Sequence, residues 1–446
     1  MGVRLVIVGG SAAGMSAAAK ARRTNGDLEI VVYEKSSFVS YGSCGFPYFL
    51  KGEVPRIEDL IVRTPQEFAN QGIHAKVRHQ VLSLDPRERT VRVRNLETGE
   101  ELTDHWDRLI LTTGGVASRP PIPGLSLAGI FTLRIPEDAL AIRAWLEQAE
   151  RKWAVIVGGG YIGLEMAEAL AARGLHITLV EMLPQVMPGM DPEMAGHVLE
   201  ELRRNGVDVR LEHPVEAFEG DGRVRAVVAG GERFPADVVI LSVGVKPEVT
   251  LARAAGIALG PTGAVAVDDH QRTNLPDIWA AGDVAEALHL VTGKPAYIPL
   301  GTTANKQGRV AGTNAAGGEA VFPGIVGTAV VKVFDLEVAH TGLSERSARA
   351  EGYDVQTVTV SAPARAHYMP SHPSIHLKLV FERGSQRLLG AQMVGREGVS
   401  KRIDILAAAL SARWTTYDLA RLDLSYAPPF APVWDPILVA ANVANR

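Results

Sequence analysis

The sequence predicts an α/β protein in which two units, each built on a parallel sheet, precede a C-terminal α+β region. Two observations indicate this. The order apolar strand, glycine-rich turn, helix and second strand occurs twice, over residues 4–34 and 154–181. From about residue 322 the glycine-rich turns stop, and β-rich runs are followed by a helical stretch. With 446 residues, of which 46% are hydrophobic, the chain is long enough for about three domains with sizeable cores.

The first repeat has the pattern of a Rossmann-like dinucleotide-binding unit. Its predicted elements are a strand over Arg4–Val8, a helix over Ala12–Arg22 and a strand over Glu29–Tyr33. The turn between the first strand and the helix is Gly9-Gly10-Ser11-Ala12-Ala13-Gly14, with Ser11 in place of the usual second glycine, and Glu34 lies 20 residues after Gly14. Small residues let the backbone approach a pyrophosphate, the helix N-terminus stabilises its charge, and the acid accepts a hydrogen bond from a ribose hydroxyl.

The second repeat contains every glycine of the pattern. A strand is predicted over Ala154–Val157, a helix up to about Ala172 and a strand over Ile177–Glu181, with the turn Gly158-Gly159-Gly160-Tyr161-Ile162-Gly163. Glu181 follows Gly163 by 18 residues. A carboxylate there would bind a free ribose 2′-hydroxyl and repel a 2′-phosphate, which favours NADH over NADPH. The two repeats together predict two bound nucleotides.

Cys44 is the only cysteine, and it lies in the segment Ser40 to Tyr48, between the two glycine-rich turns. It cannot form a disulfide within its own chain. A lone cysteine is usually an unreactive buried hydrophobe, but this one precedes a predicted helix, whose N-terminal N–H groups and dipole would stabilise a thiolate. We therefore interpret Cys44 as the redox centre. Such thiol chemistry fits a reducing compartment, so we expect a cytoplasmic protein.

The composition argues against several other classes of protein. Charges of both signs are interspersed and the formal net charge is −4, so we expect no basic face for nucleic acid. No run of 18 or more apolar residues predicts a membrane span, and strand, turn and helix explain the apolar N-terminal stretch better than a secretory signal does. Because His367, His372 and His376 lack an accompanying ligand set, we predict no metal.

A third motif, Thr273 to Val284, together with Leu111 to Gly115, makes the chain resemble the two-dinucleotide flavoprotein disulfide reductases over essentially its whole length. The resemblance implies FAD in the first unit, NAD(P)H in the second and a homodimer formed by the C-terminal region. The domains it implies are residues 1–118 with 246–321 for FAD, 119–245 for NAD(P)H and 322–446 for the α+β dimerisation domain.

Two positions narrow the branch of that family. The glutathione-reductase branch has a second redox cysteine five positions after the first, where this chain has Phe49, and NADH peroxidases have a histidine where this chain has Ala12. The surroundings of Cys44, with the segments Lys401 to Asp404 and Tyr426 to Phe430, look most like those of coenzyme A disulfide reductases in the single-cysteine branch.

The resemblance also assigns roles to individual residues. The implied catalytic residues are Cys44, Tyr368 and Tyr426. The implied FAD-binding residues are Gly9, Gly10, Ser11, Ala12, Ala13, Gly14, Glu34, Lys35, Ser43, Val81, Thr113, Gly114, Arg134, Gly282, Asp283, Pro299, Leu300, Gly301, Thr303, Tyr426 and Phe430. The implied NADH-binding residues are Gly158, Gly160, Tyr161, Ile162, Gly163, Glu165, Glu181 and Gly244. The implied substrate-binding residues are Ser16, Lys20, Arg23, Ser40, Ser43 and Asn305.

The reaction implied is hydride transfer from NADH to FAD, followed by reduction of a disulfide between Cys44 and a bound small thiol. By resemblance, Tyr161 acts as a movable gate and Glu165 lies near the nicotinamide. Tyr426 and Phe430 reach the flavin of the partner subunit across the dimer interface.

Coenzyme A disulfide is the favoured substrate, with Lys20, Arg22 and Arg23 as cations for its phosphates. Asn305 and Trp434 stand where some coenzyme A disulfide reductases have His and Lys, so polysulfide, persulfide and dioxygen stay open as acceptors.

Two other functions are compatible with these motifs. One is an NADH oxidase, in which Cys44 cycles through a sulfenic acid and dioxygen is reduced. The other, from a different class, is a redox-sensing flavoprotein with Cys44 as the sensor. The strength of the preference for NADH and the existence of higher oligomers stay open as well.

Overall fold

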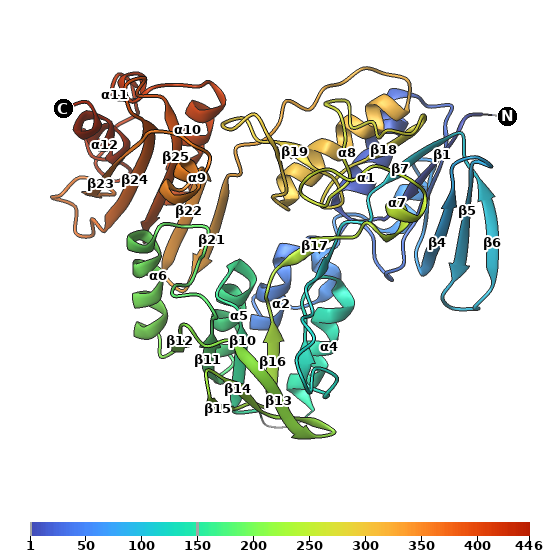
Figure 1. Ribbon diagram of the computed structural model, residues 1–446, viewed down its shortest axis with the longest axis horizontal. Helices are drawn as coiled ribbons and strands as arrows, with labels where there is room; N and C mark the ends of the chain where they lie inside the picture. The colour runs from blue at the N-terminus through green and yellow to red at the C-terminus, as the bar shows by residue number, and fades with distance from the viewer. Residues whose placement is uncertain (1, 149–150) are drawn as a thin grey trace.

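The computed structural model describes residues 2–148 and 151–446, which form three packed units (Figure 1). The first unit contains a five-stranded parallel sheet with strand order β18-β7-β1-β2-β3. Its strands are β1 (Arg4–Val8), β2 (Glu29–Tyr33), β3 (Ile73–Lys76), β7 (Arg108–Leu111) and β18 (Ile278–Ala280). Because β18 pairs with β7 from far along the chain, this sheet is assembled from two separate stretches of sequence.

The second unit repeats this arrangement. Its parallel sheet has the order β12-β11-β10-β16-β9, with strands β9 (Ile130–Phe131), β10 (Trp153–Val157), β11 (His176–Val180), β12 (Asp208–Arg210) and β16 (Val238–Leu241). Each unit also contains a three-stranded antiparallel meander: β4 (His79–Asp85), β5 (Thr90–Asn95) and β6 (Glu101–His105) in the first, β13 (Val215–Asp221), β14 (Arg223–Ala229) and β15 (Glu232–Pro235) in the second. Helices cover the sheets, as parallel strands require.

Helices α1 (Ala12–Thr24) and α8 (Gly301–Ala315) lie against each other beside the first sheet (Figure 1). Glycines permit the close approach. A Cβ added at Gly308 would lie 2.3 Å from the Ala13 carbonyl oxygen, and one at Gly312 would lie 2.2 Å from that of Ala17. Larger side chains would therefore separate the helices.

Shorter elements connect these layers. In chain order they are η1 (Ser43–Gly45), α2 (Phe46–Lys51), η2 (Ile57–Leu60), α3 (Pro65–Ala69), β8 (Gly115–Ala117), α4 (Pro136–Glu147), α5 (Tyr161–Ala171), α6 (Pro192–Arg204), β17 (Val245–Pro247), α7 (Thr250–Ala254), β19 (Ala287–Leu288) and β20 (Pro295–Ala296). Apolar residues of α2 share one core with α5, with the second sheet and with one face of the C-terminal sheet.

The C-terminal unit, at the upper left of Figure 1, is an antiparallel sheet with the order β21-β22-β25-β24-β23, packed on helices. Its strands are β21 (Ala329–Val333), β22 (Leu336–Gly342), β23 (Val355–Pro363), β24 (Ser374–Glu382) and β25 (Leu388–Gly395), and its helices are α9 (Glu345–Ala350), α10 (Val399–Ser411), α11 (Thr416–Ala420) and α12 (Pro436–Ala444). The tail that the sequence indicates only as Pro-rich thus ends in a helix whose Ile437 is fully buried.

Candidate active site at the junction of the three units

The first glycine-rich turn has the geometry that a bound pyrophosphate requires. Gly9 has a φ of +105°, and a Cβ on Gly14 would lie 1.9 Å from the Gly9 carbonyl oxygen. Ser11 precedes α1 without capping it through its side chain, so the first N–H groups of the helix remain available to an anion.

The Glu34 side chain is hydrogen-bonded to the backbone of this turn. One carboxylate oxygen accepts from the Gly10 N–H at 2.6 Å and the other from the Ser36 N–H at 2.7 Å. Burial raises the pKa of the Glu34 carboxyl. Because a carboxylate oxygen has two lone pairs, each can accept a further hydrogen bond from a ribose hydroxyl.

The second turn has the same design. Gly158 has a φ of +102°, and a Cβ on Gly163 would lie 2.0 Å from the Gly158 carbonyl oxygen. The buried Glu181 carboxylate accepts from the N–H groups of Gly159 at 2.7 Å and Leu183 at 2.9 Å. Both acids therefore stand at the tip of the second strand, where a ribose is expected.

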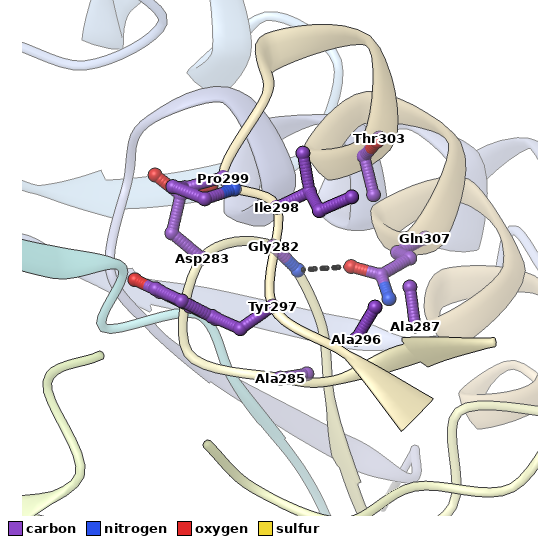
Figure 2. A pocket seen from close by; sticks show the side chains of 10 residues that line it. All are labelled: Gly282, Asp283, Ala285, Ala287, Ala296, Tyr297, Ile298, Pro299, Thr303 and Gln307. Carbon is purple, nitrogen blue, oxygen red and sulfur yellow. Dashed lines mark hydrogen bonds between the residues drawn. The ribbon is translucent and has the colours of Figure 1, made fainter. Parts of the chain in front are cut away.

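The Thr273 to Val284 motif ends at a cluster that Figure 2 shows from close by. Gly282, with a φ of +79°, donates its N–H to Gln307 Oε1 at 2.9 Å, and Gln307 Nε2 donates to the Glu286 carbonyl at 2.9 Å. Asp283 forms an ion pair with Arg134. Gln307 thus fixes the loop that presents Asp283.

Tyr297 lies beside Asp283, and in Figure 2 their oxygen ends point to the same side. The Tyr297 hydroxyl is buried and finds no hydrogen-bond partner among the residues that the structure describes. A polar group of a bound cofactor would supply the missing hydrogen-bond partner of this hydroxyl. The unpartnered hydroxyl, the free N-terminus of α1 and the glycine-lined turn fit FAD.

Sequence reasoning missed both Gln307 and Tyr297. A buried glutamine in the middle of a helix flanked by Ala304 and Ala311 was the available signal for Gln307, because a buried amide needs partners. The sequence around Tyr297 carries no comparable signal.

Cys44 sits in the η1 turn, held next to the first glycine-rich turn. The Ser40 N–H donates to the Gly10 carbonyl at 2.9 Å, and the Gly42 N–H donates to the Leu60 carbonyl at 2.9 Å. A Cβ on Gly45 would lie 2.3 Å from Leu60 Cδ2, so this loop packs tightly on the following segment. The Cys44 side chain remains exposed at the end of that loop.

The pKa of the Cys44 thiol is raised, whereas the helix that follows was expected to lower it. Surrounding atoms partly desolvate the sulfur and raise the pKa of the thiol, and the Glu165 carboxylate raises it further. Arg134 and a hydrogen bond from Ser43 act in the opposite direction. The pKa of the Cys44 thiol therefore lies above its ordinary value, and stabilisation of a thiolate by the helix that follows stays a prediction.

Helix α5 brings the second unit to Cys44. Burial raises the pKa of Glu165 to about 7, with a contribution from the nearby Glu168. Glu168 accepts from Lys51 Nζ at 2.9 Å, Lys332 Nζ at 2.6 Å and the Phe334 N–H at 2.7 Å. One carboxylate thus links the helix after Cys44, the helix after the second turn and the C-terminal sheet.

The candidate gate Tyr161 is the first residue of α5. Its phenol is hydrogen-bonded to Nε2 of His340 in β22. Burial lowers the pKa of His340 to about 4, so the ring is neutral at pH 7. We assign the phenol as donor and the Nε2 lone pair as acceptor.

Four of the six predicted substrate residues lie on α1 and α8, whereas Ser40 and Ser43 lie in the segment that carries Cys44. Ser16, Lys20 and Arg23 follow one another at helical spacing, and Ser16 Oγ donates to Asn305 Oδ1 at 2.6 Å. Arg22 differs, because its guanidinium donates to the backbone carbonyls of Leu28 and Gly72 and thereby braces the fold. It is not free to bind phosphate.

The remaining predicted nucleotide residues have defined positions. The Val81 side chain is buried in the core of the first unit, Lys35 is exposed next to Glu34, and Thr113 Oγ1 donates to the Glu248 carbonyl at 2.7 Å. Positive φ angles occur at Gly114 (+72°) and Gly244 (+100°). The segment Pro299 to Thr303 leads into the N-terminus of α8, and Ile162 packs against the core shared with α2.

Tyr368 and Tyr426 form a pair, their hydroxyl oxygens 3.0 Å apart. Both are exposed, as is Phe430, whose exposed fraction is 79%. In Figure 1 the β23–β24 connection that carries Tyr368 lies at the far left, on the side of the C-terminal unit away from α2. Within one chain, therefore, these residues and Cys44 form separate groups.

Two groups of side chains have ligand types that could suit a metal. Asp268, Asp269 and His270 are at the surface. Asp191, Glu193 and Glu345 surround the ammonium of Lys378, which lies 3.1 Å from Asp191 Oδ2 and is ion-paired with all three carboxylates. Among the described residues, no helix is both long and apolar enough to cross a membrane.

Comparison with known proteins relates this geometry to a family. The family described as pyridine nucleotide-disulphide oxidoreductase matches residues 3–308, and its dimerisation domain matches residues 328–436, which supports a homodimer. An NAD(P)H coenzyme A polysulfide/persulfide reductase from Pyrococcus horikoshii is 42% identical over 441 residues, covering 99% of this chain and 98% of the relative. An NADH oxidase from Methanocaldococcus jannaschii is 36% identical, covering 100% of this chain and 99% of the relative.

A solved structure has the same fold. The NAD-dependent persulfide reductase from A. fulgidus superposes with a TM-score of 0.97 at 41% identity, covering 99% of this chain and 83% of the other. The chain belongs to the pyridine nucleotide-disulphide oxidoreductase family, which confirms the predicted fold class, the predicted enzyme class and the use of FAD with a nicotinamide nucleotide.

Proposed function

We propose that this enzyme passes reducing equivalents from NADH, through FAD and Cys44, to coenzyme A disulfide or a related persulfide or polysulfide. One observation carries the proposal: the only thiol of the chain lies in a loop held beside the first dinucleotide turn, and it is close enough to Glu165, on the helix after the second turn, for that charge to act on it. The activities printed for the relatives from P. horikoshii and A. fulgidus support it. A reducing cytoplasm is the compartment that suits a free thiol of this kind.

The first turn, Glu34, the Arg134–Asp283 pair, Tyr297 and the N-terminus of α8 would hold FAD; the second turn and Glu181 would hold NADH. FAD supplies the chemistry that links a hydride donor to a two-electron sulfur acceptor. The Glu181 carboxylate would accept from a free ribose 2′-hydroxyl and repel a 2′-phosphate, which supports the proposed preference for NADH.

Cys44 performs the sulfur chemistry. Its thiolate attacks one sulfur of the substrate disulfide, forming a mixed disulfide with Cys44 and releasing one thiolate. Two electrons then cleave the mixed disulfide, which restores the Cys44 thiolate and releases the second thiol after protonation. Because its pKa is about 7, Glu165 can hold or release a proton next to the sulfur at neutral pH.

The substrate and the partner subunit complete this proposal. Ser16, Lys20, Arg23 and Asn305 form one polar surface that suits the phosphates of a nucleotide thiol. The exposed Tyr368–Tyr426 pair and Phe430 are proposed to reach the site of the partner subunit, where a phenol would donate to the leaving thiolate. Their exposure in a single chain supports burial by a second copy.

NADH oxidase activity is the second candidate, favoured by the relative from M. jannaschii. In that case Cys44 passes through a sulfenic acid, and dioxygen takes the electrons.

The test starts from holoenzyme reduced anaerobically with NADH. Coenzyme A disulfide, polysulfide or oxygenated buffer is added in separate mixes, and flavin reoxidation is followed for wild type and Cys44→Ser. We expect rapid reoxidation by a sulfur acceptor in the wild type and its loss in Cys44→Ser, while NADH still reduces the flavin of both. Fast reoxidation by oxygen alone would replace the reductase by the oxidase.

A further inference from the structure

The hydrogen bond between Tyr161 and His340 joins two units that are distant in sequence. Tyr161 begins α5 of the second unit, and His340 lies in β22, a strand in the interior of the C-terminal sheet. The two ring centroids are 6.0 Å apart. A residue proposed to move when a nucleotide binds is therefore held by a part of the chain outside its own unit.

His340 belongs to a polar row that crosses the C-terminal sheet. It pairs with Gln392 on β25, which in turn pairs with Lys378 on β24. Gln392 Oε1 accepts from the Asp191 N–H at 2.8 Å, and its Nε2 donates to Asp191 Oδ2 at 2.6 Å. Lys378 approaches the same carboxylate at 3.1 Å. All three side chains of the row thus reach into the second unit.

This row makes His340 a fixed acceptor. Lys378 and Gln392 are 1% exposed, and Val338 and Val394, two residues away on their strands, belong to the core shared with α5. Charge-assisted and buried hydrogen bonds of this kind hold the sheet face against the second unit. The backbone of His340 thus lies in a strand, paired on both sides, of a sheet that Gln392 and Lys378 anchor to the second unit.

We propose that His340 is the positioning residue of the nicotinamide gate: it holds the Tyr161 ring in place, and an incoming nicotinamide nucleotide must break that hydrogen bond to displace the ring. The inference rests on the gate role proposed for Tyr161. It assigns to the C-terminal unit, besides subunit assembly, control over access to the second nucleotide site.

Calorimetric titration of the holoenzyme with NAD⁺ tests the inference without turnover. A net hydrogen bond corresponds to roughly a fivefold change in affinity, so the dissociation constant should fall about fivefold in His340→Leu and in Tyr161→Phe. The double variant should show no further decrease, because both changes remove the same bond. His340→Gln, which retains an acceptor, should restore the wild-type value.

His376→Leu is the matched control. This histidine lies on β24 of the same sheet and stacks on His197 of α6 at 3.9 Å between ring centroids, but its contact does not include Tyr161. The inference is overturned if His340→Leu binds NAD⁺ like the wild type, or if His376→Leu gives the same shift, since general loosening of the sheet would then explain both.

Two further measurements separate this inference from the proposals on which it rests. Tyr161→Ala removes the ring, so unchanged NAD⁺ binding in that variant would overturn the gate role of Tyr161, and with it the positioning role of His340. In steady state, His340→Leu should lower the KM for NADH and leave kcat unchanged. If kcat fell as much as KM, the inference would be overturned and His340 would have a structural role. If the wild type binds NAD⁺ but reduces no sulfur acceptor, the proposed substrate is wrong while the positioning role of His340 stands.

Discussion

The two parallel-sheet units share a strand order and a glycine-rich turn closed by a carboxylate, yet their first helices are covered in different ways. Helix α1 of the first unit packs on α8 through Gly308 and Gly312, with small residues on both sides. Helix α5 of the second unit is bordered by ionisable and polar contacts, from Tyr161 with His340 to Glu168 with two lysines.

The difference fits the roles proposed for the two units. Close contact between backbones leaves little freedom and suits a cofactor that stays bound. Ionisable contacts respond to pH and to a ligand, and they suit a site where a nucleotide enters and leaves in every cycle. The same fold thus occurs twice, once with its first helix packed closely on another helix and once with its first helix bordered by polar contacts.

The largest effect is expected from valine at the last glycine of each turn. Gly14→Val and Gly163→Val place methyl groups where even a Cβ would lie 1.9 or 2.0 Å from a carbonyl oxygen. We expect Gly14→Val to be purified without flavin absorbance, and Gly163→Val to keep its flavin but to lose at least about 100-fold in the rate of flavin reduction by NADH.

Gly26→Val is the control for these variants, because open space surrounds Gly26. Loss of flavin from Gly163→Val would show that the two turns do not act independently.

Glu165→Gln should stabilise the protein in alkaline solution. The folded pKa is about 7 against an ordinary 4.5, so the folded state binds the proton more tightly, and stability is lost as the pH rises from about 4.5 through 7. Glutamine avoids that cost of about 3 kcal/mol. Thermal unfolding should therefore show a higher midpoint for the variant at pH 8 and equal midpoints near pH 4. The same shift at both values would contradict the assignment.

Glu168→Gln should destabilise the protein, with the opposite pH dependence. Lys332, Lys51 and the Phe334 N–H hold the pKa of Glu168 below its ordinary value, so its contribution is present above pH 4.5 and lost as the pH falls through the folded pKa. We expect a loss of about 2 kcal/mol in the free energy of unfolding at pH 7. Glu147→Gln, which removes a surface pair with Arg143, should cost about 0.5 kcal/mol or less and is the control. Equal effects of both variants would exclude a special role for the cluster.

The smallest effect concerns nucleotide choice. Glu181→Ala should reduce the ratio of kcat/KM for NADH to that for NADPH by about tenfold or less, because a hydrogen bond and a repulsive charge are both lost. Glu34→Ala, the equivalent change in the first unit, should weaken FAD binding and leave the ratio unchanged. A constant ratio in Glu181→Ala would remove this residue from selectivity.

The sequence was sufficient for the local parts of the fold. Strands β1 and β2 have the expected bounds, and β10 and β11 begin and end within one residue of theirs. Apolar runs and glycine-rich turns are local signals that depend on neighbours in sequence. The turns, their acids and the position of Cys44 between them follow from the same signals.

The contacts between units could not be predicted in this way. Lys378 and Gln392 lie in strands where a polar residue normally indicates exposure to solvent, yet both are buried, and both contact Asp191 of the second unit. The raised pKa of Cys44 could not be predicted from the local motif either, because it comes first from burial and then from Glu165, which lies in another unit. Residue patterns reveal which face is polar but not which distant residue it meets.

The pairing of β18 with β7 has a consequence for synthesis of the protein. The second unit is continuous in sequence and can fold as soon as it emerges, whereas the first sheet and the α1–α8 contact wait for residues beyond 278 and 301. Such non-local pairing is slow, since a long loop must close before its contacts form. Until then β7 presents an open edge on the nascent chain, so we expect the N-terminal unit to be the part that depends on chaperones and on timely arrival of its cofactor.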